Sequence, residues 1–378
     1  MKNLALGAIL LAGLCASASA LTRIGETAEL FVTGSLNARA DDNVFLTDLD
    51  ETDDTIFELT PGLRFVFGQG ALFNGSVEAG ETFIRFLDND SLDDELFSAA
   101  LATRFDDAKT KILFDLSFRE LNQSTRDVRG ATLIRRDVFS GRLDSQVSLS
   151  DKSSVVVGIA YEDTDYADSA YVDIRETAFP LNYYYSISEK IDLSAGVRYR
   201  RTGLTGNSNY SEDFYYNLGA RGDFTPKFSG YFSVGFNQRE LDAGGDESSI
   251  GALADLQYLL TEKTAFALSV INDFRTSVEG ISQKSLSITP SIKTNFNAQW
   301  EGTAALTFQT LEYFNGREDD YIEASVRIGY RVSTHTTLHA SYHYRTNDSN
   351  LSFTDTDGRT RSADFDNSVI QLGASVRF

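Results

Sequence analysis

Apolar and polar side chains alternate along residues 321–332, which read YIEASVRIGYRV. Successive side chains of a β-strand point to opposite faces, so this segment has one apolar and one charged face as a strand. A helix would scatter both sets around its axis. A tilted strand of about 9–11 residues crosses a hydrocarbon layer. The pattern therefore predicts a membrane-spanning strand whose apolar face meets lipid and whose polar face meets a water-filled lumen.

The same alternation recurs in residues 111–119, 191–200, 337–345 and 368–378. Short polar turns punctuate the chain, and the last six lie 36–38 residues apart. These turns are centred near Gln69, Asp107, Asp151, Glu189, Pro226, Glu262, Ala298 and Thr334. A regular spacing of this length between turns is typical of consecutive β-hairpins. A solenoid would carry Leu or Asn ladders, or helices, and none is evident.

Longer, acidic connections lie between the short turns. They are residues 41–54, 88–94, 122–130, 163–170, 203–212, 242–247, 278–283, 316–320 and 346–364. Nine long loops and eight short turns predict eighteen strands in an all-β, antiparallel, up-and-down transmembrane barrel. Both chain ends then lie on the short-turn side, and pairing of the first strand with the last removes both sheet edges.

Two irregularities are expected within the strands. The region 72–86 changes parity partway, which predicts a β-bulge. Pro61, Pro180 and Pro290 each precede a short turn by eight or nine residues. Because proline cannot donate a ladder hydrogen bond, bulges or bends are expected there too.

Residues 1–20 have the features of a secretory signal peptide. Lys2 gives a positive start, residues 4–14 are an apolar run, and Ala18-Ser19-Ala20 is a small-residue cleavage site. The apolar run is too short to span a bilayer as a helix, which takes about 20 residues. The single cysteine, Cys15, is removed with this segment, so no disulfide or thiolate chemistry is expected. Residues 21–378 are expected to form a single barrel.

Net charge and the available chemistry exclude several classes of function. The chain carries −21 at pH 7, which argues against nucleic acid as a partner because phosphate binding needs a basic footprint. The only histidines are His335, His339 and His343. In a strand, residues four apart lie about 13–14 Å apart, too far to share one metal ion. Ser341 between two histidines is an unspecific pattern, so we expect no catalytic residue, no metal site and no cofactor.

Acidic clusters such as 48–51 and 355–358 could bind Ca²⁺ or Mg²⁺ weakly, although none has a complete calcium-loop spacing. A solvated external surface is the simpler interpretation.

Aromatic residues at 183–185, 215–216 and 313–314, together with Trp300, lie toward strand ends. An interfacial aromatic girdle is expected there, and a surface for stacking sugars is the alternative.

Charged residues recur at the alternate positions of the predicted strands that face the lumen. A lipid-facing Arg or Lys at the bilayer midplane costs about 2–4 kcal/mol, so these side chains are assigned to the lumen. The candidate pore-lining residues are Arg119, Asp192, Arg198, Arg200, Arg239, Glu323, Arg327, Arg331, His339, His343 and Arg345. They could fill the lumen with salt bridges or line a channel. Barrels of 16–18 strands leave an aqueous channel, and no connection looks long enough to fold inside, so an open passage is expected.

The last strand, 368–378, is amphipathic and ends in Phe378. This ending resembles bacterial outer-membrane β-barrels, in which it implies recognition by the barrel-assembly machinery. The segments LNARADDNVFLTD and FELTPGLRFVF resemble the family called putative β-barrel porin type 2, through Asp41-Asp42-Asn43, Phe45 and Thr60-Pro61-Gly62. Some members of that family are encoded with exopolysaccharide-export systems.

The sequence thus predicts an outer-membrane, porin-like channel for passive diffusion of small hydrophilic solutes in a Gram-negative-type bacterium. From the resemblance, an alternative is a component of exopolysaccharide export that meets partner proteins at the periplasmic mouth. A non-conducting structural or surface-binding barrel is a further alternative, and an enzyme is the least favoured. The sequence leaves the solute, the ion selectivity and any homo-oligomer open.

Overall fold

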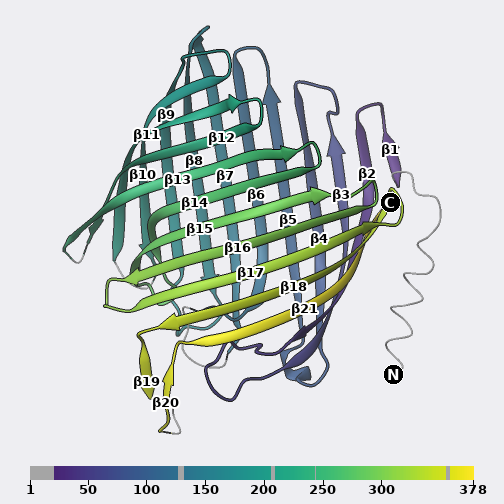
Figure 1. Cartoon of the computed structure of the whole chain (residues 1–378), viewed down its shortest axis with the longest axis vertical. Coiled ribbons are helices and arrows are strands. Elements are labelled where there is room, and N and C mark those ends of the chain that lie inside the picture. The colour runs from purple at the N-terminus through teal and green to yellow at the C-terminus, as the bar shows by residue number, and fades with distance from the viewer. Residues whose placement is uncertain (1–20, 127–131, 206–208, 243, 355–357) are drawn as a thin grey trace.

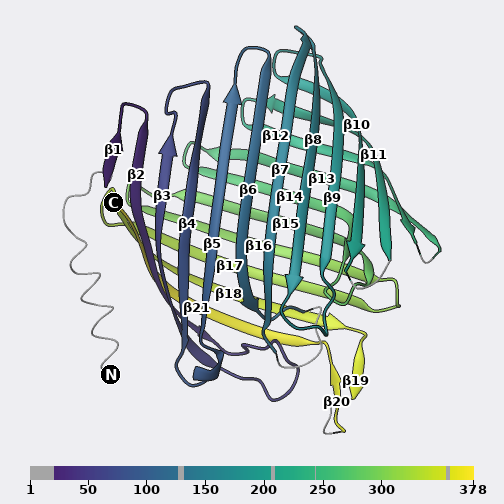
Figure 2. The ribbon, with the colours of Figure 1, turned by 180° about the vertical axis from the view of Figure 1, so that it is seen from behind.

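The computed structural model describes residues 21–126, 132–205, 209–242, 244–354 and 358–378. The predicted signal peptide lies outside the described residues. Within them, eighteen antiparallel strands close into one barrel (Figures 1 and 2). They are β2 (Ala28–Asp41), β3 (Asp54–Phe67), β4 (Phe73–Phe86), β5 (Asp94–Asp106), β6 (Thr110–Gln123), β7 (Ile134–Ser150), β8 (Ser153–Tyr166), β9 (Ile174–Ser186), β10 (Ile191–Leu204), β11 (Tyr210–Thr225), β12 (Phe228–Leu241), β13 (Asp246–Thr261), β14 (Thr264–Thr276), β15 (Ser282–Asn295), β16 (Trp300–Tyr313), β17 (Glu318–Arg331), β18 (Thr336–Ser349) and β21 (Phe365–Arg377).

Closure of the ring is made by the first and last of these strands. β21 pairs with β2 from Thr33↔Arg377 to Asp41↔Val369. Val32 and Phe378 exchange two backbone hydrogen bonds of 2.7 and 2.8 Å. A short additional strand, β1 (Thr22–Ile24), pairs with β2 just before the barrel begins. The strand number, the closure and the all-antiparallel topology predicted from the sequence are confirmed.

The connections alternate in length as predicted. In the described chain, each of the eight expected short turns falls between the strands of a hairpin, and the longer connections gather at the opposite mouth. In the β5–β6 turn, backbone N–H groups of Lys109 and Thr110 donate to the carboxylate of Asp107 and lower its pKa. The last long connection holds a hairpin that the sequence did not predict, β19 (Ser352–Thr354) with β20 (Thr360–Ser362), which projects beyond the barrel (Figure 1).

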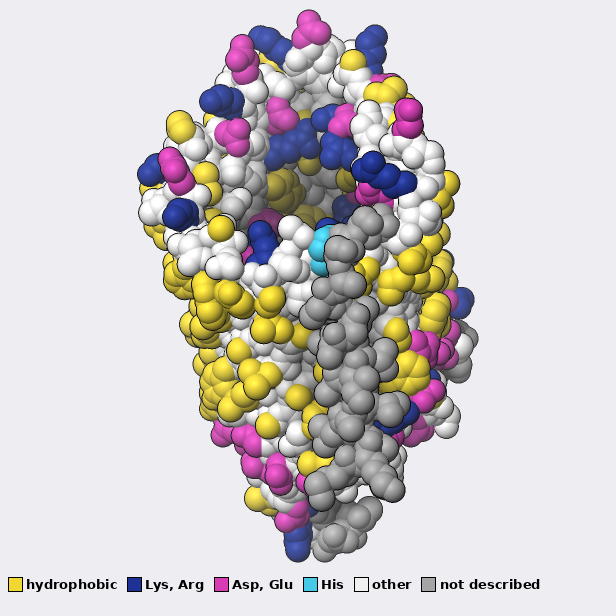
Figure 3. Space-filling model, turned by 90° about the vertical axis from the view of Figure 1, so that its right-hand side faces the viewer, with side chains coloured by type: hydrophobic (Ala, Val, Ile, Leu, Met, Phe, Trp, Pro, Cys, Tyr) yellow, Lys and Arg dark blue, Asp and Glu magenta, His cyan; other side chains and the backbone are white. Residues whose placement is uncertain are grey.

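The barrel is apolar outside and polar inside because the strand period places alternate residues on opposite faces. Outward side chains such as Leu218 and Leu372 are 67% and 62% exposed. Figure 3 shows hydrophobic side chains spread over this outer surface. In the described residues, no helix is long and apolar enough to cross a membrane. Strands run from 13 residues in β5 to 17 in β7, longer than the crossing alone needs, because pairing continues beyond the apolar band.

The predicted bulge in 72–86 is wrong. β4 keeps one register with β3 and one with β5 throughout. The prolines also produce no register shift. At Pro61, Pro180 and Pro290, two residues drop out of the ladder with one neighbour, while the ladder with the other neighbour continues. Each proline lacks a backbone N–H, and the strand therefore leaves two residues unpaired on one side. No extra residue is inserted, so no β-bulge forms.

Candidate pore lining

The candidate pore-lining residues lie on the face of their strands opposite to most of the exposed hydrophobic residues. On β10, Leu193 points outward, whereas Asp192, Arg198 and Arg200 point inward. The same parity places Arg119 of β6 and Arg239 of β12 inside. The inward residues of β17 and β18 include Glu323, Arg327, Arg331, His339, His343 and Arg345.

The mouth near the short turns is hollow. Figure 3 looks toward the side on which Phe378 lies and shows a deep opening with Lys, Arg, Asp and Glu side chains inside it. Arg221, inside this barrel, donates to Asp192 at 3.0 Å and its guanidinium lies 3.6 Å from the ring centroid of Tyr184. Arg331 lies at this mouth beside Trp300 and Thr337. A hollow, charged interior of this kind agrees with the lumen assigned from the sequence.

Deeper in the barrel, two buried carboxylates organise the arginines of β10 and β12. Asp213 of β11 accepts from Arg200 Nε at 2.6 Å and from Arg239 Nε and Nη2 at 2.6 and 2.8 Å. Asp213 and Arg239 are both 0% exposed. Removing one partner of such a pair leaves an uncompensated buried charge, so this cluster fixes β10, β11 and β12 relative to each other.

The second carboxylate, Asp273, comes from β14 and not from a neighbouring strand. It accepts from Arg198 Nη2 at 2.8 Å, from Arg200 Nη1 at 3.1 Å and from Asn237 Nδ2 at 2.7 Å. Arg200 also donates to the backbone carbonyl of Phe274 at 2.7 Å. These contacts bring the end of β14 against the inner face of β10–β12.

This approach is possible because the end of β14 separates from β13, while it stays paired with β15 as far as Thr276↔Ser282. Its pairing with β13 ends at Ala252↔Asn272, although β13 continues alongside β12 to Asp246. Phe274 has outward parity, yet it is 0% exposed and packs edge-on against Phe314. The end of β14 and the connection to β15 therefore fold into the lumen.

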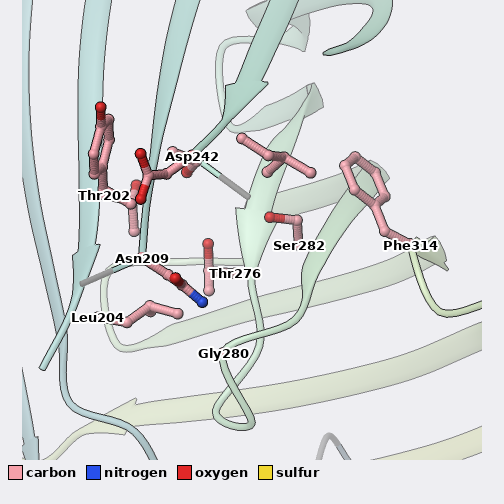
Figure 4. Close-up of a pocket in the computed structure, with 11 residues that line it drawn as sticks. Thr202, Leu204, Asn209, Asp242, Thr276, Gly280, Ser282 and Phe314 are labelled. Atoms are coloured by element: carbon pink, nitrogen blue, oxygen red, sulfur yellow. The ribbon is translucent and has the colours of Figure 1, made fainter. Parts of the chain in front are cut away.

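The inward-folded connection reaches other loops. The N–H of Val172, in the β8–β9 connection, donates to the carbonyl of Val278 at 3.2 Å. Gly280 lies near the turn of the β14–β15 connection, on the side of Leu204 and Asn209 from the β10–β11 region (Figure 4). Gly280 has φ +76°, and a Cβ there would meet Leu204 at 3.1 Å, so glycine suits both the backbone and the space.

Arg126, at the start of the β6–β7 connection, also reaches into the barrel interior. Arg126 follows β6, and its guanidinium lies 4.3 Å from the ring centroid of Tyr321 on β17 and donates to Gln309 on β16 at 2.5 Å. Arg317 donates back to the carbonyl of Arg126 at 2.8 Å. Among the described strands, nine separate β6 from β16 one way round the ring and seven the other way. Arg126 thus contacts the nearly opposite wall.

The β2–β3 connection is also turned inward. Val44 packs with Ile56, Ile84 and Phe86 in a buried apolar cluster on the inner side of β3 and β4. Asn43 is fully buried and donates to the carbonyls of Thr47 and Asp366. The expectation that no connection folds inside the barrel is wrong, because three connections narrow the long-loop end.

The acidic clusters behave differently from a purely solvated surface. Asp50 accepts from Arg361 Nη2 at 2.8 Å and from Arg359 Nη1 at 2.9 Å, and Asp48 accepts from the N–H of Ser362 at 2.8 Å. These contacts join the first and last long connections. Residues 355–357 lie outside the described residues. No described group of three or more His, Cys, Asp or Glu side chains is placed to hold a metal ion.

The histidines separate as the strand spacing implied. His335 lies in the turn before β18, His339 is buried on the inward face, and His343 Nδ1 lies 3.6 Å from Glu323 Oε1.

The aromatic residues divide between the two faces of the barrel wall. Tyr183, Tyr185, Tyr216 and Trp300 are exposed on the outside, whereas Tyr184, Tyr215 and Tyr313 are buried in the lumen. The outward set fits an interfacial girdle.

The closed eighteen-stranded barrel, apolar outside and charged inside, defines the class of outer-membrane porins and transporters. A family model described as "Putative beta-barrel porin 2" matches residues 30–378, and the chain belongs to that family. It is a porin-like channel protein of the outer membrane. No curated protein matches the sequence.

Solved outer-membrane proteins share the architecture. OccK1 (OpdK) of Pseudomonas aeruginosa is 12% identical, with a TM-score of 0.51 over 92% of this chain and 99% of that chain. The structure of OpdK with vanillate, from the same species, gives a TM-score of 0.50 at 12% identity, over 92% of this chain and 99% of that chain. At this identity the likeness shows the fold.

Proposed function

We propose that this barrel passes small hydrophilic solutes across the outer membrane by passive diffusion, without catalysis. The observation that supports this most strongly is the hollow short-turn mouth lined with charged side chains, in a chain of the porin family (Figure 3). A lumen built only as a structural filling would have its charges paired throughout. Here, Arg327 and Arg331 face the hollow without an ion pair to any described carboxylate.

The route is narrow at the long-loop end. Solutes pass between the barrel wall and the connections that fold inward after β2, β6 and β14. The Arg198–Asp273 and Arg200–Asp273 contacts hold one side of this narrowing. We therefore expect a small channel with a low cut-off in solute size.

Liposome swelling tests this function directly. Vesicles containing the folded protein should swell in isosmotic glycine or arabinose faster than in raffinose, because the narrowing excludes the trisaccharide. Vesicles of the same lipid without protein give the background rate. Swelling at the background rate in every solute, with protein shown to be folded, contradicts passive diffusion.

We further propose that Phe378 is the signal for the barrel-assembly machinery. Support comes from its position in the last strand, where it joins Val32 at the seam and stacks on His335 with centroids 6.4 Å apart. Deletion of Phe378 should lower the amount of folded barrel in cells more than it lowers folding in detergent. Polysaccharide export and homo-oligomer formation stay predictions.

A further inference from the structure

A chamber of about 470 Å³ lies between the inner wall of β6–β10 and the inward-folded end of β14. Its charged lining includes Arg119 of β6, Arg136 of β7, Glu162 of β8 and Arg275 of β14. Aliphatic side chains complete it, namely Leu121, Val138, Ile174, Ile271 and Val278. The volume falls within the range of about 300–1,000 Å³ that is common for small-molecule sites.

The charges of this chamber are incompletely paired. Arg200 is satisfied by Asp213 and Asp273. By contrast, none of Arg119, Arg136 and Arg275 forms an ion pair with a described carboxylate, although Glu162 lies within electrostatic reach of Arg119 and Arg275. The other glutamate of the lining, Glu176, lies 3.8 Å from Arg200 Nη1.

Arg136 carries the clearest sign of a missing anion. The half-buried Arg136 side chain lines the chamber, and its Nη1 has no hydrogen-bond acceptor among the described residues. A buried donor without an acceptor costs free energy, and a guanidinium is built to bind a carboxylate through two parallel hydrogen bonds. The whole chain is strongly acidic at −21, so this cationic group is a local arrangement and not a reflection of the overall charge.

We propose that the chamber binds a small organic acid, with its carboxylate at Arg136 and its apolar part against Leu121, Val138 and Ile271. The aliphatic lining favours an organic acid over an inorganic oxyanion. An organic acid can bury its apolar part against these side chains, whereas phosphate has no apolar part to bury. Glu162 disfavours a dianion by repulsion. The binding site deepens the proposed function by naming a solute class, but binding itself does not require that solutes cross.

Isothermal titration of the folded, detergent-solubilised protein with benzoate tests this site. Benzamide has the same shape without the charge, and inorganic phosphate has charge without the apolar body. Arg136→Gln removes the proposed anchor. Arg142→Gln is the matched control, because Arg142 lies on the same inward face of β7, about 20 Å nearer the short turns, and pairs with Asp144.

Saturable benzoate binding that Arg136→Gln weakens at least about tenfold, and Arg142→Gln leaves within about twofold, supports the site. Arg136→Lys should fall between the wild type and Arg136→Gln, because Lys keeps the charge and loses the planar pair of donors. The proposal is overturned if folded protein binds no benzoate, binds benzamide or phosphate as well as benzoate, or responds equally to the two Gln substitutions. Because titration measures binding alone, loss of swelling with binding retained would overturn the channel and leave the site standing.

Discussion

Replacing Asp213 by Asn tests whether the buried charge cluster holds the barrel together. The carboxylate is 0% exposed and receives three hydrogen bonds of 2.6–2.8 Å from Arg200 and Arg239. The substitution keeps the shape and leaves two arginines facing a neutral amide. Breaking a buried pair by removing one partner costs about 3–5 kcal/mol, so the free energy of unfolding should fall by that amount.

Guanidinium unfolding in lipid vesicles measures this loss, and the fluorescence of Trp300 reports it. Trp300 is the only tryptophan and is 43% exposed on the outer face, so its surroundings change when the barrel leaves the lipid. The control is Asp50→Asn, whose side chain is 64% exposed and should cost no more than about 1 kcal/mol. Equal effects of the two substitutions would refute the reasoning.

Three further predictions follow from the faces and the inward-folded segments. Leu218→Arg should lower the free energy of unfolding by about 2–4 kcal/mol in the same assay, because the residue faces lipid; no change would mean that it does not. Val172→Cys with Val278→Cys should form a disulfide spontaneously, since their backbones are hydrogen-bonded at 3.2 Å, without changing conductance. A drop in conductance on oxidation would show that the β14–β15 connection normally lies elsewhere. Arg126→Ala should raise single-channel conductance, because it frees the chain after β6 from Gln309 and Tyr321; unchanged conductance would place this segment outside the solute path.

The barrel itself could be predicted because its determinants are local. Apolar and polar residues alternate along 321–332 and 191–200, which assigns each residue to a face of its strand. The number of turns and loops gives the number of strands. The inward assignment of Arg198, Arg200 and Arg239 followed from the same period. These steps need no knowledge of which distant residues meet.

The narrowing could not be predicted in the same way. The connection 277–281 has the length of an ordinary loop, and its direction depends on Asp273 meeting Arg198 and Arg200 from another part of the ring. For the same reason the roles of Asp213, Asp273, Arg136 and Arg275 were missed. Parity alone does not show which inward charges face each other.

One signal for inward-folded loops was present in the sequence. Ile56, Ile84 and Phe86 have the inward parity near the long-loop ends of their strands, where a wet lumen would favour polar residues. Apolar residues at such positions need cover, and Val44 of the β2–β3 connection supplies it. Counting apolar residues on the inward parity near strand ends would have indicated that this mouth is covered.

The measurement that most directly tests the account is single-channel recording of the folded protein in a planar bilayer under a salt gradient. An aqueous lumen predicts stable, repeated conductance steps, of small size because three connections narrow the long-loop end. Absence of steps from protein that is shown to be folded and inserted would contradict the central claim that this barrel is a channel.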